Sequence, residues 1–114
     1  MLSISSSLRI LLCREPTDMR RAFDGLARMV VEALGENPLS GHLFVFRNKR
    51  GDRLKILYWD RDGYALWYKR LEEGVFRFPK VVDGRAEVSA AELALILEGI
   101  DVTGLKRRKR YARP

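Results

Sequence analysis

The chain has 114 residues, of which 46% are hydrophobic and 32% charged, with a net charge of +7 and a single cysteine. This length suits one domain, the hydrophobic fraction argues against global disorder, and one cysteine excludes an internal disulfide. No apolar stretch approaches the ~20 residues of a membrane span, and we expect no signal peptide. The sequence therefore predicts a cytoplasmic protein in which Cys13, within an apolar run, is buried and inert.

The positive charge is unevenly distributed along the chain. Residues 42–80 carry ten basic and five acidic side chains, whereas residues 81–104 carry one basic and five acidic side chains. Residues 105–114 carry six basic side chains and no acidic one. Such asymmetry indicates a polyanion as partner, and an acidic protein surface would satisfy it equally.

The first predicted elements are a short strand and a helix. Residues 8–13 are suited to a strand that ends before Pro16. Thr17 or Asp18 can then cap a helix, and Gly35 can end it in the left-handed conformation. The apolar face of this helix is predicted to consist of residues at helical spacing, namely Met19, Phe23, Leu26, Ala27, Val30, Val31 and Leu34.

After residue 41 the apolar pattern changes to a period of two, which indicates strands. The turn Asp60-Arg61-Asp62-Gly63 is typical of a hairpin, in which we expect Gly63 to take a positive φ and the aspartates to bond to nearby backbone amides. The pattern predicts three long strands and a shorter fourth one, over residues 42–47, 53–59, 64–69 and 75–78.

The C-terminal part is predicted to contain a loop, a helix and a tail. Residues 80–87 are interpreted as the loop, after which Ser89 and Glu92 form a capping box. The helix that follows turns Leu93, Ile96 and Leu97 inward and ends at Gly99. Residues 105–114 have no apolar period, and their charge predicts an extended, mobile tail.

Together these elements predict an α+β fold. The sheet is small and mainly antiparallel, with about four to five strands, one helix before the central hairpins and one after. We interpret residues 1–104 as a single domain and residues 105–114 as a basic tail outside it. The oligomeric state does not follow from the sequence.

The simplest strand register gives the sheet two different faces. An apolar face would pack against the first helix and consist of Phe44, Phe46, Leu54, Ile56, Tyr58, Leu66, Phe76 and Phe78. A cationic face with two indoles would consist of Arg47, Lys55, Trp59, Trp67, Lys69 and Arg77. This second face could stack on bases and contact phosphates, or its indoles could lie under a helix or loop with basic side chains around them.

The sequence contains no recognisable catalytic or metal-binding arrangement. Asp60 and Asp62 could hold Mg²⁺, but hydrogen bonding within the turn explains the pair better. His42 is the only histidine and has no partner at a recognisable spacing. Zinc spacing, a phosphate-binding glycine loop and a nucleophile elbow are all lacking. We therefore expect no enzymatic activity, no metal and no cofactor.

Nucleic-acid binding has more support from the composition. Lys and Arg side chains attract phosphates, and aromatic side chains stack on exposed bases. The candidate contact residues lie on the predicted strands, in the loop between the first two of them, and in the tail: Arg47, Lys49, Arg50, Arg53, Lys55, Trp59, Trp67, Lys69, Arg77, Lys106, Arg107, Arg108, Lys109 and Arg110.

Several blocks of the sequence, taken together, indicate a family. The blocks are Thr17-Asp18-Met19-Arg20 with Phe23-Asp24-Gly25-Leu26-Ala27, then residues 41–48, 52–60, 66–72 and 97–101. Over about residues 10 to 104 they resemble the small accessory protein, TnpB type, of the bacterial insertion sequence family sixty-six. That protein is unrelated to the RNA-guided nuclease of similar name. The resemblance implies a role in transposition beside a separate, larger transposase subunit that carries the acidic catalytic residues.

The resemblance and the charge pattern together predict a non-catalytic accessory factor for DNA transposition. Its expected partners are DNA and the transposase subunit of the same element, and no catalytic residue is carried over from the family. In the alternative interpretation, the protein is purely a protein–protein interaction module of the transposition complex and makes no direct contact with DNA.

Overall fold

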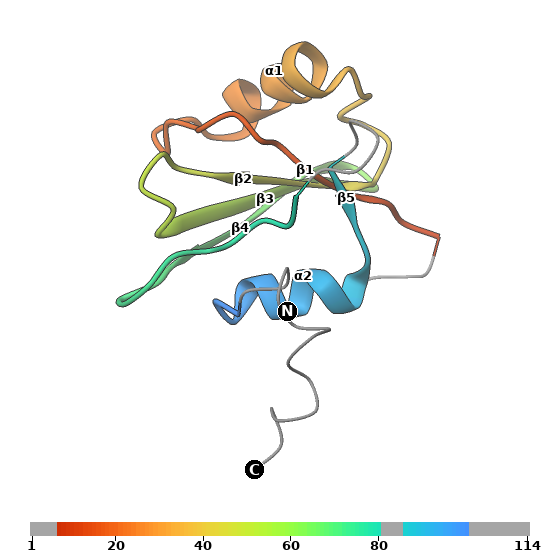
Figure 1. Cartoon of the computed structure of the whole chain (residues 1–114). Helices are drawn as coiled ribbons and strands as arrows, with labels where there is room; N and C mark the ends of the chain where they lie inside the picture. The colour runs from red at the N-terminus through yellow and green to blue at the C-terminus, as the bar shows by residue number, and fades with distance from the viewer. Residues whose placement is uncertain (1–6, 81–85, 101–114) are drawn as a thin grey trace.

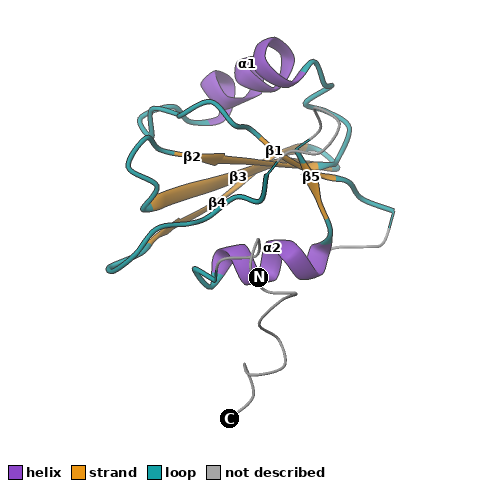
Figure 2. Cartoon of the chain, in the orientation of Figure 1, coloured by secondary structure: helices purple, strands orange, loops and turns teal. Residues whose placement is uncertain are grey.

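A computed structural model describes residues 7–80 and 86–100 and places one helix against each face of a five-stranded sheet (Figure 1). The elements in chain order are β1 (Ile10–Leu12), α1 (Phe23–Leu34), β2 (Leu43–Arg47), β3 (Arg53–Asp60), β4 (Gly63–Arg70), β5 (Glu87–Val88) and α2 (Ala90–Leu97). Figure 2 shows α1 and α2 on opposite sides of the strands. The predicted α+β class, with its mainly antiparallel sheet, is confirmed.

The strand order across the sheet is β4-β3-β2-β1-β5. β1 and β2 are parallel and joined through α1, whereas the other neighbouring pairs are antiparallel. His42 helps to align the parallel pair, because its Nδ1 accepts a hydrogen bond from the Arg9 amide at 3.0 Å. This contact gives the only histidine a structural role at the entry to β2.

Each face of the sheet carries its own apolar core. The core on the α1 side consists of Leu11, Cys13, Leu26, Met29, Val30, Phe44, Phe46 and Leu57. The core on the α2 side consists of Ile10, Leu12, Leu43, Val45, Leu54, Ile56, Phe76, Val88, Leu93, Ile96 and Leu97. Since both faces are covered, the central strands are apolar in both directions, as in sheets buried between two layers of helices.

The predicted assignment of strand faces is wrong. Phe46 lies opposite Lys55 and Val45 opposite Ile56, so the face that carries Phe44 and Phe46 is not the face that carries Ile56. Residues directly opposite in an antiparallel pair point to the same side of the sheet, so Lys55 shares the α1 side with the two phenylalanines. The expected separation into one apolar and one cationic face does not exist.

α1 also differs from its prediction at its start and along its outer flank. It begins at Phe23, and the Asp18 carboxylate bonds to the Arg20 amide at 2.9 Å instead of capping the helix. Phe23 and Val31 were expected on the packed face but are 45% and 55% exposed. The predicted end is confirmed, since Gly35 takes a φ of 64°.

The hairpin between β3 and β4 forms where predicted, but the residue with the positive φ is not the predicted one. Arg61, not Gly63, has the positive φ, at 57°. The carboxylates of Asp60 and Asp62 make no hydrogen bond within residues 7–80 and 86–100, so the expected capping of turn amides by these side chains is wrong. The turn instead uses a backbone bond from the Asp62 amide to the Asp60 carbonyl.

The segment after β4 contains a strand that was missed and lacks one that was expected. Residues 75–78 form no strand; the Phe76 amide donates to the Gly51 carbonyl at 2.7 Å. β5 pairs with β1 and begins at Glu87, the last residue of the stretch predicted as a loop. The capping box is confirmed, because the Ser89 hydroxyl accepts from the Glu92 amide and the Glu92 carboxylate accepts from the Ser89 amide.

Leu93, Ile96 and Leu97 are buried, so their predicted inward positions are confirmed. α2 ends at Leu97, two residues before the predicted end at Gly99, which has a φ of 79°. Among the residues that the structure describes, no helix has the length and apolar character required to cross a membrane.

Gly51 is the glycine on which the loop between β2 and β3 depends. It has a φ of +86°, and a Cβ added there would lie 3.2 Å from the Val75 Cβ. We expect Gly51→Ala to lower the free energy of unfolding by about 1–3 kcal/mol, because the backbone strain and the close contact act together. Chemical denaturation would measure this loss. Gly63→Ala is the matched control, since Gly63 has no positive φ and open space around it; equal losses in both variants would contradict the prediction.

Candidate nucleic-acid interface

The loop between β2 and β3 presents two of the predicted contact residues on a rigid support. The Asn48 Oδ1 accepts the Gly51 amide at 2.9 Å and the Arg53 amide at 3.0 Å. The Asn48 Nδ2 donates to the Asp52 carboxylate at 2.8 Å, and this bond lowers the pKa of Asp52. Lys49 and Arg50 lie between these anchored positions and are exposed. They are therefore held at a defined site while their charges remain in solvent.

A shallow groove of about 490 Å³ lies beside this loop. Its lining residues come from the segment before α1 and from the loop and start of β3: Thr17, Asp18, Met19, Arg20, Asn48, Lys49, Arg50 and Arg53. Arg20 pairs with Asp18 at 2.7 Å, and this contact lowers the pKa of Asp18 to about 2. The groove thus contains four cationic side chains and one carboxylate, which is already paired.

Lys55 was predicted as a contact residue, but its ammonium is bound within the protein. The side chain is only 6% exposed, and its Nζ donates to the carbonyls of Met19 at 2.7 Å and Arg21 at 2.8 Å. The same Nζ lies 4.8 Å from the centre of the Tyr68 ring, a cation–π contact. Lys55 therefore ties the segment before α1 to β3.

Arg47 and Lys69 are also bound within the fold, on the α2 side of the sheet. The Arg47 Nη1 donates to the Phe76 carbonyl at 2.7 Å, and its guanidinium lies 4.1 Å from the centre of the Phe78 ring. The Lys69 Nζ donates to the Leu97 carbonyl at 2.9 Å, at the C-terminal end of α2, where a positive charge is favoured. Both side chains hold elements together.

The two indoles lie on opposite faces of the sheet, so the predicted surface that contains both of them is wrong. Trp59 lies opposite Tyr64 on the α1 side, and their rings meet edge to face at 5.2 Å and 84°. Trp67 lies opposite Ile56 and packs against the α2-side core. Trp67 is therefore partly buried against the core, in agreement with the alternative interpretation of indoles packed inside the fold.

The structure brings only some of the predicted contact residues together. Lys49, Arg50 and Arg53 meet at the groove, whereas Arg77 is exposed in the irregular segment after β4. Arg20 was missed, and no local signal identifies it, because the groove joins segments about 30 positions apart in the chain. The predicted tail residues, Lys106, Arg107, Arg108, Lys109 and Arg110, lie outside the described residues.

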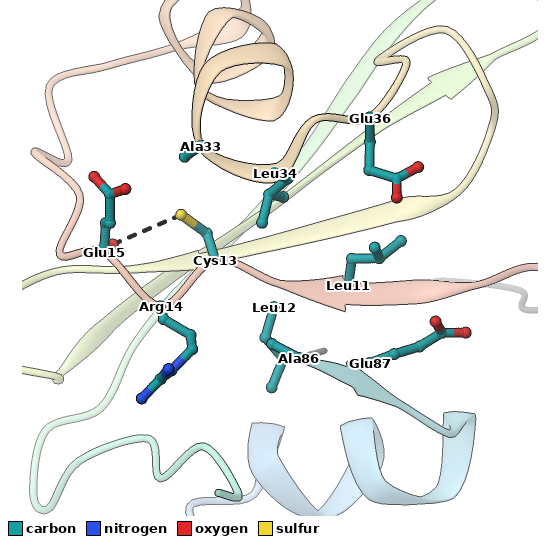
Figure 3. Close-up of a pocket in the computed structure, with 10 residues that line it drawn as sticks. All are labelled: Leu11, Leu12, Cys13, Arg14, Glu15, Ala33, Leu34, Glu36, Ala86 and Glu87. Carbon is teal, nitrogen blue, oxygen red and sulfur yellow. Dashed lines mark hydrogen bonds between the residues drawn. The ribbon is translucent and has the colours of Figure 1, made fainter. Parts of the chain in front are cut away.

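A separate cavity of about 240 Å³ lies between β1, β5 and the end of α1 (Figure 3). Cys13 lines it, and its Sγ contacts the Glu15 carbonyl at 3.8 Å. Burial raises the pKa of the Cys13 thiol, which agrees with the predicted buried cysteine. Within the described ranges, no group of three or more His, Cys, Asp or Glu residues is placed to hold a metal ion.

Comparison with known proteins identifies the family. Residues 8–107 match the family model described as IS66 Orf2 like protein. The chain is 44% identical to the uncharacterized protein y4jC of Sinorhizobium fredii (strain NBRC 101917 / NGR234) over 108 residues, which cover 95% of this chain and 92% of that one. It is 42% identical to the uncharacterized protein y4hO of the same strain over 101 residues, 89% of this chain and 88% of that one.

No solved structure matches the chain. The family match extends over most of the sequence and includes every strand and helix described above. It also includes the segment before α1 and the loop between β2 and β3, which together form the groove. The chain therefore belongs to the IS66 Orf2-like family and is an accessory protein of an insertion sequence.

Proposed function

We propose that this protein is a non-catalytic accessory factor for transposition that contacts the DNA backbone through the loop between β2 and β3 and through the basic residues near its C-terminus. The observation that carries the proposal is the exposed pair Lys49 and Arg50 on a loop that Asn48 holds rigid. Lys and Arg contacts to phosphate provide affinity that does not depend on sequence and weakens with salt.

The proposed contact surface is smaller than the one predicted from the sequence alone. It excludes Lys55 and Lys69 as backbone contacts, because the ammonium of each donates to a carbonyl within the protein. Replacing those bonds by bonds to phosphate would leave the carbonyls without a donor, at a cost in stability. Arg47 does not line the groove beside the loop. The surface consists of Lys49, Arg50, Arg53, Arg77, Lys106, Arg107, Arg108, Lys109 and Arg110.

A second candidate function is a module that binds the transposase subunit without touching DNA. Its support is apolar surface: Phe23 and Val31 are about half exposed on α1, and Tyr68 is 47% exposed on β4. β4 is also an edge strand, with a partner on one side only among the described strands. An edge strand beside exposed apolar side chains is a common docking arrangement for another chain.

The affinity for DNA, measured at several salt concentrations, separates the two functions. We expect the full chain to bind duplex DNA at low salt, with log K falling linearly with log salt concentration. Neutralising one cation that binds a phosphate should reduce that slope by about 0.9, so Lys49→Gln with Arg50→Gln should reduce it by about 1.8. Arg28→Gln is the control, because Arg28 is an exposed cation on α1 outside the groove. A third full-length variant replaces the five cations at 106–110 by Gln.

The outcomes assign the contacts. If the full chain does not bind DNA at low salt, the DNA proposal is wrong, and retained binding of purified transposase at high salt would then support the interaction module. If only the variant at 106–110 loses affinity, the loop is not a contact surface. If the loop variant and the Arg28 variant change the slope equally, the effect is one of net charge and not of the loop.

A further inference from the structure

Among the residues that the structure describes, three cationic side chains and no carboxylate line a cavity of about 200 Å³ on the α2 side of the sheet. Arg14 follows β1, Arg47 ends β2, and Lys80 follows the irregular segment after β4, so three separate parts of the chain meet there. The remaining lining residues are apolar and form its walls: Leu12, Phe78, Pro79 and Ala86. None of the groove residues beside the loop between β2 and β3 lines this cavity.

The parallel register of β1 and β2 explains why Arg14 and Arg47 meet. Leu12 lies level with Val45, and both face the α2-side core. Because side chains alternate along a strand, Arg47, two residues after Val45 at the end of β2, faces the same side. Arg14 lies two residues beyond the end of β1 and lines the same cavity. Figure 3 shows the Arg14 side chain directed away from the side of β1 to which Cys13 points.

Arg47 is held in place before any ligand arrives. Its Nη1 bond to the Phe76 carbonyl uses one of its five N–H donors, and its guanidinium carbon lies over the Phe78 ring, so the group is held by two contacts. Burial lowers the pKa of Arg47, but the arginine side chain remains protonated at neutral pH. A fixed, partly buried guanidinium with free donors is an effective recognition group for an oxyanion.

Three cations elsewhere among the described residues are paired with carboxylates, whereas the cavity cations are not. Arg9 pairs with Glu87, Arg20 with Asp18 and Arg70 with Glu72, each within 3 Å. Within residues 7–80 and 86–100, no ion pair involves the three cavity cations, Arg14, Arg47 and Lys80. Like charges around a partly buried cavity repel one another, and a bound anion would remove that repulsion.

We propose that this cavity binds a phosphate group, with Arg47 as the fixed donor and Arg14 and Lys80 as solvent-exposed cations that complete the site. The group could be free inorganic phosphate or a phosphodiester of the DNA backbone, since both present the same oxygens. The inference does not depend on the DNA contacts of the loop between β2 and β3, because those contacts use other residues.

The test is an NMR titration of the full chain with inorganic phosphate at constant ionic strength, in which chloride replaces phosphate in the reference series. We expect saturable shifts of the Arg47 side-chain N–H signals. In Arg14→Gln with Lys80→Gln, phosphate affinity should fall about tenfold or more, because this variant cannot form two of the charge-assisted hydrogen bonds. Both residues are exposed, so this variant should fold as the parent does. Arg28→Gln with Arg61→Gln removes two exposed cations elsewhere and should leave the affinity unchanged.

A second titration with duplex DNA identifies the source of the phosphate group. If DNA shifts the Arg47 signals, if added phosphate reverses these shifts, and if the shifts are smaller in the variant Arg14→Gln with Lys80→Gln, the bound group is a phosphodiester of the DNA backbone. Saturable binding of phosphate without any effect of DNA on these signals indicates free phosphate. The proposal is overturned if phosphate and chloride act alike, or if the cavity variant and its control bind phosphate equally. DNA binding that depends only on Lys49 and Arg50 would then leave the proposed function intact.

Discussion

Phe76→Ala is expected to lower the free energy of unfolding by about 3–5 kcal/mol, the usual cost of removing a fully buried phenylalanine side chain from a core. Phe76 is fully buried in the α2-side core, although it lies in a segment that forms no strand. Its backbone bonds, from its amide to Gly51 and from Arg47 to its carbonyl, do not involve the side chain. The loss should therefore come from the cavity and from the reduced burial of apolar surface.

Chemical denaturation at equilibrium would measure this change. Phe23→Ala is the matched control, because it removes the same side chain from a site that is 45% exposed, and its cost should remain below about 1 kcal/mol. If the two variants were destabilised to the same extent, Phe76 would not anchor the segment after β4 in the α2-side core.

Lys55→Met should destabilise the protein less than Phe76→Ala does, with a loss of about 2–4 kcal/mol in the free energy of unfolding. Methionine retains much of the volume but removes both hydrogen bonds of the ammonium to the carbonyls of Met19 and Arg21. The two acceptors then lose a charged donor, and the segment before α1 loses its tie to β3. The expected loss is larger than that of a single neutral hydrogen bond because the donor is charged.

The matched control is Lys49→Met, which removes an exposed lysine from the loop between β2 and β3. Its effect on stability should remain within about 0.5 kcal/mol. The two variants also separate fold from binding: Lys49→Met should weaken DNA binding without loss of stability, and Lys55→Met should do the reverse at temperatures where it remains folded. A stable Lys55→Met variant with reduced DNA affinity would instead assign Lys55 to the contact surface.

Several features that depend on a few neighbouring residues were predicted correctly. The capping box of α2 depends on Ser89 and Glu92, and the end of α1 depends on Gly35; both are confirmed. The positions of β2, β3 and β4 follow from alternation and from the hairpin turn, and they are confirmed within one or two residues. The start of α1 was wrong because Asp18 satisfies a nearby amide without starting a helix, a common alternative use of this side chain.

The faces of the strands could not be read from alternation. In β2 the residues Leu43 to Phe46 are apolar on both sides, since each side packs against its own core. A strand that is buried on both faces carries no polar alternation to distinguish them. The short strand β5 was missed for a related reason: its two residues pair with β1, far away in the chain, and contain no local signal of a strand.

The sequence by itself determined the class of fold, the order of its main elements, the capping box of α2, the end of α1 at Gly35 and the family, because these depend on neighbouring residues or on patterns along the chain. Only the tertiary structure decided which cations could meet a ligand. Lys55 and Lys69 donate to carbonyls that lie 28 to 36 positions away in the sequence, whereas Lys49 and Arg50 remain exposed. Burial and hydrogen bonding across such separations are set by packing, and the residue type alone does not reveal them.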